Sequence, residues 1–91
     1  MLKHVWIKLV ALNCAAFVMQ LIFPWFTFLF ALDPKVVFDA PWMFFTSMFL
    51  HAGMEHIMYN MFALVFFGIV AEYTVGSKKF ITAYIISGLV A

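Results

Sequence analysis

Charge is the scarcest property of this 91-residue sequence. Charged residues make up 10% of the chain and arginine is absent, whereas roughly 25% of residues are charged in an average soluble protein. A soluble protein of this size leaves much of its chain at the surface, and so few charges cannot cover that surface. The scarcity therefore excludes a soluble domain. The separated lysines also form no basic patch, so nucleic acid is excluded as a partner.

Cysteine is nearly absent as well. The single Cys14 lies in an apolar run and has no second cysteine to bond with, which excludes a disulfide framework and a cysteine-based zinc site. Apolar residues, by contrast, make up 68% of the chain, against roughly 45 to 50% in an average soluble protein. The sequence therefore predicts an integral membrane protein.

A first transmembrane helix is predicted over about residues 5–32. The stretch from Leu9 to Leu32 contains no charged side chain, and ~20 apolar residues are enough to span a ~30 Å hydrocarbon core. We expect Pro24 to kink this helix without breaking it. The polar side chains of the span are Asn13, Gln20 and Thr27. Lipid cannot satisfy their hydrogen bonds, so we expect them to face other helices.

The rest of the chain is predicted to form a membrane-embedded loop and two more helices. The loop covers about residues 33–53 and includes a short apolar helix near residues 41–50, too short to span the membrane. A second transmembrane helix of ~30 Å follows over about residues 54–73. After a turn at residues 76–79, a third helix occupies residues 80–91 and covers only ~18 Å. The expected fold is thus an all-α membrane protein with two full transmembrane helices and a partial third, interpreted as the N-terminal fragment of a longer protein.

The lysines predict the orientation of the chain in the membrane. Those on one side of a two-span topology are Lys3, Lys8, Lys78 and Lys79. Lys35 stands alone on the other side, among acidic residues. Because cytoplasmic segments carry the excess of lysine and arginine, we expect the N-terminus to be cytoplasmic. We expect the membrane to be the plasma membrane. A cleaved signal peptide is the alternative interpretation of the first two lysines, but the apolar run after them is longer than such a peptide requires.

Three polar residues near the start of the second predicted helix are candidates for chemistry. His56 and Asn60 are four residues apart, so they share one helix face and can point N–H donors at a common point. His51 meets His56 only if the backbone breaks between them, which Gly53 permits. Ionisable residues at membrane depth are costly and therefore suggest a function. The alternative is that all three are interfacial groups bonded to loop carbonyls.

These residues belong to a pattern that resembles the rhomboid intramembrane serine proteases. His-x4-His-x3-Asn is followed on the same predicted helix by Gly-x3-Glu-x3-Gly, with the spacing of that family's second transmembrane helix. The matching residues are Trp42, Thr46, Phe49, His51, His56, Asn60, Gly68, Glu72 and Gly76. The resemblance covers about residues 41–91. It departs at Met43, where many bacterial members have arginine.

The resemblance implies a specific chemistry. In rhomboids the residues that match His56 and Asn60 help to form the oxyanion hole, and the residue that matches His51 supports the site. The nucleophilic serine lies in a Gly-x-Ser-Gly motif on the fourth transmembrane helix, and its histidine partner lies on the sixth. No serine of this chain has that motif. The resemblance therefore implies part of a protease that cleaves transmembrane substrates with a Ser–His dyad, inactive by itself and needing no cofactor or metal.

A second group of residues is expected to have structural roles. Its members are Trp42, Gly53, Gly68, Glu72 and Gly76. The last three form an i, i+4, i+8 row on one helix face. Glycines in such a row allow another helix to approach closely, and Glu72 can find donors in the following turn or in the third helix.

The expected partners are the lipid bilayer, transmembrane protein substrates and the remaining helices of the full-length protein. Helices without those neighbours are expected to make the chain self-associate. Two other functions stay open. A rhomboid-like pseudoprotease would keep the fold as a membrane binding or quality-control module. A metal-binding membrane protein would use His51, Glu55, His56 and Glu72, although Glu72 lies ~24 Å along the helix from His56 and the spacing is not His-Glu-x-x-His.

Overall fold

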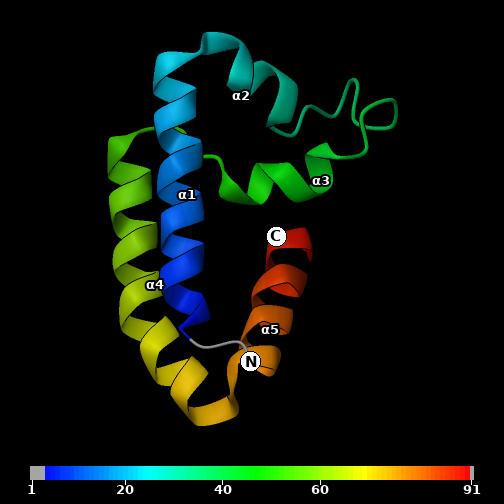
Figure 1. The fold of residues 1–91 in the computed structure, drawn as a ribbon. Helices are drawn as coiled ribbons and strands as arrows, with labels where there is room; N and C mark the ends of the chain where they lie inside the picture. Colours follow the sequence, from blue (N-terminus) through cyan, green and yellow to red (C-terminus); the bar gives the residue numbers. More distant parts are fainter. Residues whose placement is uncertain (1–3, 91) are drawn as a thin grey trace.

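The computed structural model describes residues 4–90, and every regular element among these residues is a helix (Figure 1). The elements are α1 (Val5–Ile22), α2 (Pro24–Phe30), α3 (Met43–Thr46), the short 3-10 helix η1 (Ser47–Phe49), α4 (Met54–Val75) and α5 (Ser77–Val90). They form a body of 39 × 26 × 22 Å. The predicted all-α fold is confirmed. Lys3, used to predict the orientation, and Ala91, the end of the predicted third helix, lie outside the described residues.

Two helices form the long axis of the molecule. In Figure 1, α1 and α4 lie side by side and run in opposite directions, and α5 turns back from the end of α4. Both α1 and α4 are long and apolar enough to cross a membrane, with lengths of ~27 Å and ~33 Å at ~1.5 Å per residue. Only 22% of α1 and 11% of the apolar window of α4 are buried inside the molecule, so most of their apolar side chains face outward.

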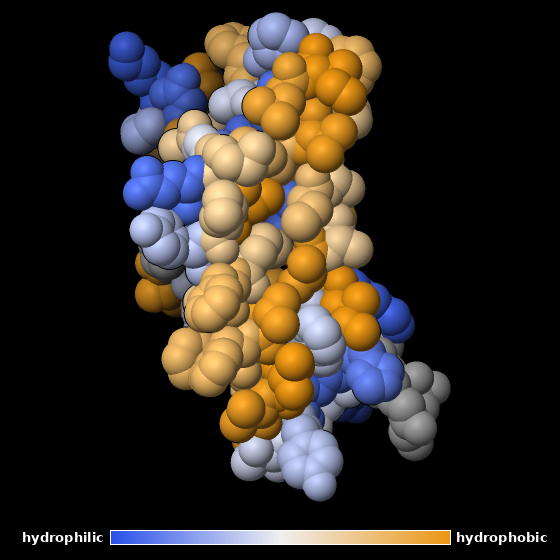
Figure 2. Space-filling model, turned by 90° about the vertical axis from the view of Figure 1, so that its left-hand side faces the viewer, coloured by the Kyte–Doolittle hydropathy of each residue, from blue (hydrophilic) through white to orange (hydrophobic). Residues whose placement is uncertain are grey.

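The outward face of α4 is a continuous apolar surface. Large side chains recur on it at helical spacing: Met58 is 65% exposed, Phe62 74% and Phe66 61%. Figure 2 shows this side of the molecule, where hydrophobic side chains cover almost its whole length. Water does not favour a surface of this extent on a monomeric protein, whereas lipid does. The fold is that of a helical membrane protein.

The first predicted helix is broken, not kinked, at Pro24. Helix α1 ends at Ile22, Phe23 has the extended angles φ −118° and ψ 105°, and α2 begins at Pro24. Proline disfavours a helical conformation in the residue before it and lacks an N–H, but it fits the first position of a new helix. Helix α2 therefore leaves the axis of α1 (Figure 1). The prediction of one helix over residues 5–32 was wrong.

Side chains at the start and end of α3 hold α2 in its new direction. The indole Nε1 of Trp42 donates a hydrogen bond to the carbonyl oxygen of Leu29 at 3.0 Å, and the hydroxyl of Thr46 donates to the carbonyl oxygen of Phe30 at 2.7 Å. These carbonyls belong to the last turn of α2, where no helical N–H is available. Met43, on the same short helix, is buried with two side chains of the preceding loop. Trp42, for which a structural role was predicted, therefore caps the end of α2.

Glu72 joins three elements at the other end of the molecule. Its carboxylate accepts hydrogen bonds from the backbone N–H groups of Val5 (2.8 Å) and Trp6 (2.9 Å) and from the hydroxyl of Ser77 (2.6 Å). The first two donors start α1 and have no partner within that helix, and a negative charge there opposes the positive end of the helix dipole. The predicted donor after α4 is present in Ser77. The contact with α1 was not predicted.

The glycines of the α4 row differ in what they do. A Cβ atom on Gly68 would lie 3.0 Å from Cβ of Trp6 and 3.4 Å from the ring of Phe80, so this position lets α1 and α5 come close, as predicted. Gly76 has a φ of +91° and forms the whole turn between α4 and α5. The predicted turn over residues 76–79 is therefore one residue long. A Cβ atom added to Gly76 would have no atom within 4 Å, so the expectation that this glycine lets another helix approach was wrong. Gly53 is extended at φ −172°, and a Cβ atom added to it would have no atom within 4 Å, so the backbone break before α4 does not require glycine.

Candidate functional site

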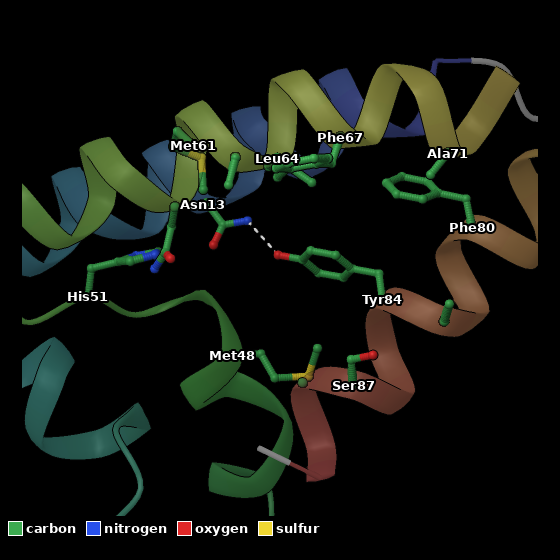
Figure 3. Close-up of a pocket in the computed structure, with 14 residues that line it drawn as sticks. Asn13, Met48, His51, Met61, Leu64, Phe67, Ala71, Phe80, Tyr84 and Ser87 are labelled. Carbon is green, nitrogen blue, oxygen red and sulfur yellow. Dashed lines mark hydrogen bonds between the residues drawn. The ribbon is translucent and has the colours of Figure 1, made fainter. Parts of the chain in front are cut away.

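A groove of about 650 Å³ runs between α4 and α5, with α1 at its base (Figure 3). Residues from α1, η1, α4, α5 and the segment before α4 line it. Those that carry polar side chains are Asn13, His51, Asn60, Tyr84 and Ser87. In Figure 3, His51 lies near one end of the groove and Phe80 near the other. The groove therefore has a polar end and an apolar end, and the polar end lies beside the first turns of α4.

His51 is the most buried of the three predicted site residues. Only 8% of it is exposed, and its imidazole Nδ1 is buried with no hydrogen-bond partner among residues 4–90. Burial, with a smaller contribution from nearby His56, lowers the pKa of the His51 imidazole below its ordinary value of 6.5. The ring is therefore neutral at pH 7 and offers one N–H donor and one acceptor.

Asn60 and His56 lie on the first two turns of α4, and both side chains are exposed. Asn60 lines the groove together with His51, whereas His56 is not among the lining residues. The structure thus brings His51 and Asn60 to one surface and leaves His56 beside it. The expectation that His56 and Asn60 share a helix face is compatible with their positions in α4, but only Asn60 reaches this groove.

Sequence reasoning missed two polar contacts that shape the groove. Asn13 is 1% exposed, and its Nδ2 donates hydrogen bonds to the carbonyl oxygen of Leu9 at 2.7 Å and to the hydroxyl of Tyr84 at 3.0 Å. The dashed line in Figure 3 marks the second bond, which connects α1 to α5 across the groove. Asn13 was predicted to face another helix, and this is confirmed. Tyr84 was not singled out, because one tyrosine in an apolar helix carries no distinguishing pattern.

The second missed contact involves Gln20. Its side-chain amide donates to the carbonyl oxygen of His51 at 3.0 Å and accepts from the backbone N–H of His51 at 2.9 Å. Gln20 was expected to face other helices. It does bond Thr27 of α2, and its other partner is the irregular segment before α4. Gln20 and His51 are 31 positions apart, so no local spacing could have indicated the pair.

The groove offers hydrogen-bond donors without a paired nucleophile. A neutral imidazole and a primary amide can both donate to an oxygen that becomes negative during acyl transfer. Ser87 also lines the groove, on α5, but within residues 4–90 it makes no hydrogen bond to a histidine that would activate it. In the same part of the chain, no three His, Cys, Asp or Glu side chains are grouped so as to hold a metal ion.

Comparison with known proteins identifies a matching domain. The family model described as Rhomboid domain matches residues 39–91. The chain is 42% identical over 60 residues to RHOMBOID-like protein 6, mitochondrial, of Arabidopsis thaliana, covering 64% of this chain and 20% of that protein. It is 43% identical over 60 residues to RHOMBOID-like protein 1 of the same plant, covering 64% of this chain and 15% of that protein.

A bacterial relative also matches. The chain is 32% identical over 59 residues to Rhomboid protease GlpG of Klebsiella pneumoniae, covering 65% of this chain and 21% of that protein. The matched region thus spans about a fifth of the length of these curated relatives. No solved structure matches the chain significantly.

Proposed function

Because this chain belongs to the rhomboid family, we propose that it forms part of an intramembrane serine protease that cleaves transmembrane protein substrates. The observation that carries the proposal is the groove beside the start of α4, which buried His51 and exposed Asn60 both line. One relative that matches this chain is named as a protease, Rhomboid protease GlpG. In this proposal the Ser–His dyad comes from outside these 91 residues, because no serine here has the Gly-x-Ser-Gly motif.

His56 and Asn60 are proposed to form part of the oxyanion hole. The attack of a serine on a peptide carbonyl puts negative charge on the carbonyl oxygen, and donors held in place beforehand stabilise that charge. The two side chains lie one turn apart on α4 and are exposed, so their N–H groups are available to a substrate. His51 is proposed to support this site from the buried side, as a neutral ring in contact with the same groove.

Substitutions of these donors test the proposal in the full-length protein. Asn60→Ala and His56→Ala are each expected to lower kcat by ~10-fold to 10³-fold, because one oxyanion donor contributes about that much to the rate. The melting temperature should stay near that of the unchanged protein. Tyr59→Phe is the matched control, since Tyr59 lies between them on α4, is 70% exposed and does not line the groove. Unchanged kcat in both donor variants of an active protease would remove the assignment.

We further propose that the N-terminus is cytoplasmic and the membrane is the plasma membrane. The bonds from Glu72 to the first turn of α1 support one part of this, because they bring the start of α1 beside the junction of α4 and α5. Lys8 and the lysine pair at the start of α5 therefore belong to one end of the molecule, and the lysine excess is expected on the cytoplasmic side. Lys35 belongs to the loop at the opposite end.

Cysteine labelling in intact cells tests this orientation. In a Cys14→Ala background, Lys35→Cys should react with a membrane-impermeant thiol reagent added outside, and Lys78→Cys should react only after the cells are opened. Both lysines are exposed on the protein, so a difference in labelling reports the side of the membrane on which each residue lies. Labelling of Lys78→Cys alone in intact cells would reverse the orientation.

The proposed partners are lipid, the remaining helices of the full-length protein and transmembrane substrates. The exposed apolar face of α4 and the open groove support this, since both leave surface that a soluble environment disfavours. The 91-residue chain in detergent is therefore expected to self-associate, with helices of a second copy in place of the missing neighbours. A clean monomer in sedimentation experiments over a wide concentration range would contradict this.

A further inference from the structure

We propose that Gln20 is a positioning residue that holds the backbone of His51 and so fixes its imidazole in the groove, with Thr27 orienting the Gln20 amide. The inference rests on the proposed function in one respect, which is that His51 serves the site. The geometric part of it stands on the hydrogen bonds of residues 4–90 and is tested separately below.

The hydrogen bonds of Gln20 form a two-point clamp. Its Oε1 accepts the backbone N–H of His51 at 2.9 Å, and its Nε2 donates to the carbonyl oxygen of the same residue at 3.0 Å. A primary amide that bonds both the N–H and the C=O of one residue copies the pairing of two extended strands. One bond would leave the segment free to rotate, whereas two bonds fix both its position and its orientation.

The His51 segment needs such a clamp because it has no regular structure to satisfy its backbone. Leu50 is extended at φ −98° and ψ 150°, and α4 begins only at Met54. His51 is 8% exposed, so water cannot reliably bond its backbone groups. Buried backbone groups without partners are costly, and more so at membrane depth. The Gln20 amide supplies the partners that secondary structure does not.

Thr27 completes the clamp from α2. Gln20 Nε2 donates its other proton to the hydroxyl of Thr27 at 3.1 Å, so each polar group of the amide is used. In one continuous helix, residues seven apart would be separated by ~10 Å along the axis, which is too far for this bond. The break before Pro24 turns α2 back and brings Thr27 within reach. The break between α1 and α2 therefore allows Thr27 to orient the Gln20 amide that bonds His51.

Amide hydrogen exchange of the 91-residue chain in detergent measures the clamp directly. In Gln20→Met, which keeps the length of the side chain but loses both bonds, the His51 amide should exchange at least ~10-fold faster. Gln20→Glu keeps the acceptor for the His51 N–H and should restore part of the protection. Thr27→Val removes only the orienting bond and should have a smaller effect than Gln20→Met.

Asn13→Leu is the matched control for general loosening. It removes a buried polar contact from the same helix, but one made with α5, and it should leave the His51 amide protected relative to the rest of the chain. If Gln20→Met leaves the exchange of the His51 amide unchanged, or if Asn13→Leu accelerates it equally, the clamp is refuted. Neither result depends on proteolytic activity.

Kinetics of the full-length protein test the consequence for the site. Gln20→Met should lower kcat by ~10-fold with little change in KM, and Gln20→Glu should recover part of the loss. Thr74→Val, which removes a side-chain hydrogen bond in the last turns of α4, should leave kcat unchanged. If Asn60→Ala lowers kcat but Gln20→Met does not, the positioning role is refuted and the proposed function stands. If Asn60→Ala has no effect on an active enzyme, the proposed function fails, and the exchange experiment still decides whether Gln20 holds His51.

Discussion

The polar side chains at the two ends of α4 differ in burial and in hydrogen bonding. In its last turn, Glu72 is buried and accepts three hydrogen bonds from α1 and α5. In its first two turns, His56 and Asn60 are exposed. A polar group whose bonds are all made within the protein contributes to stability, and a group that is left accessible is available to a ligand. We call the end with Glu72 the structural end of α4, and the end that carries the proposed oxyanion donors the chemical end.

The largest expected difference in stability between the two ends comes from Glu72. Glu72→Ala should lower the free energy of unfolding by about 2–4 kcal/mol, because it leaves the first N–H groups of α1 without partners and removes a charge-assisted contact to Ser77. Asn60→Ala should change it by less than about 0.5 kcal/mol, as is usual for an exposed side chain. Denaturant titration of both variants in the same detergent measures the contrast.

Glu72→Gln sharpens this test. It keeps the shape and one oxygen acceptor, so its effect should fall between those of the unchanged chain and Glu72→Ala. Equal destabilisation by Asn60→Ala and Glu72→Ala would show that the two ends of α4 do not differ in the way proposed.

The next effect is expected at Gly68, where α1 and α5 come close to α4. A Cβ at this position meets Cβ of Trp6 at 3.0 Å, and a Cβ atom cannot swing aside without its backbone. Gly68→Ala should therefore cost about 1 kcal/mol and Gly68→Val about 2–3 kcal/mol. Gly53→Ala is the control, because no atom lies within 4 Å of its added Cβ. If Gly68→Val leaves the free energy of unfolding unchanged, α1 and α4 can move apart at this position without loss of stability.

A smaller effect is expected at Gly76. Its φ of +91° is a conformation that side chains disfavour, although no neighbouring atom lies within 4 Å of an added Cβ. Gly76→Ala should lower stability by about 1 kcal/mol through backbone strain alone, and Gly76→Asn should lower it less, because asparagine tolerates positive φ better. Thermal unfolding of the two variants beside Gly53→Ala separates strain from crowding. Equal melting temperatures for all three would contradict the strain.

The smallest effect concerns pH at the chemical end. The pKa of His51 is lowered by burial, so below about pH 6.5 the unfolded chain binds more protons than the folded chain. Stability should therefore fall as the pH is lowered through 6.5 towards the lowered pKa. His51→Gln should reduce this dependence. The slope of unfolding free energy against pH measures it, and an unchanged slope in His51→Gln would assign the dependence to other groups.

Local patterns in the sequence predicted much of this architecture. The second transmembrane helix was expected over residues 54–73 and is found at Met54–Val75, because a long apolar run leaves its backbone no better partner than itself. The short helix of the loop was expected at residues 41–50 and is found as α3 and η1. The close approach of another helix at Gly68 was also expected, since a glycine in an apolar helix lets a neighbouring backbone come near.

Long-range contacts decided what local patterns could not. Whether a helix kinks or breaks before Pro24 depends on whether something stabilises the new direction, and here Trp42 and Thr46 do so by capping α2. The length of the turn after α4 depends on Gly76 and on the bond between Ser77 and Glu72. The sequence therefore predicted one continuous helix where the structure has a break before Pro24, and a turn of four residues where the structure has one.

The sequence by itself determined that this protein is helical, suited to a membrane and similar to rhomboids around His51, His56 and Asn60, since composition and fixed spacing are local properties. Only the tertiary structure decided which of these residues share a surface. It brought Asn60 to the groove with His51, left His56 beside it, and joined Gln20 to His51 across 31 residues. The physical reason is that backbone groups buried away from water must find partners, and the side chains that provide them come from whichever helices the fold brings close.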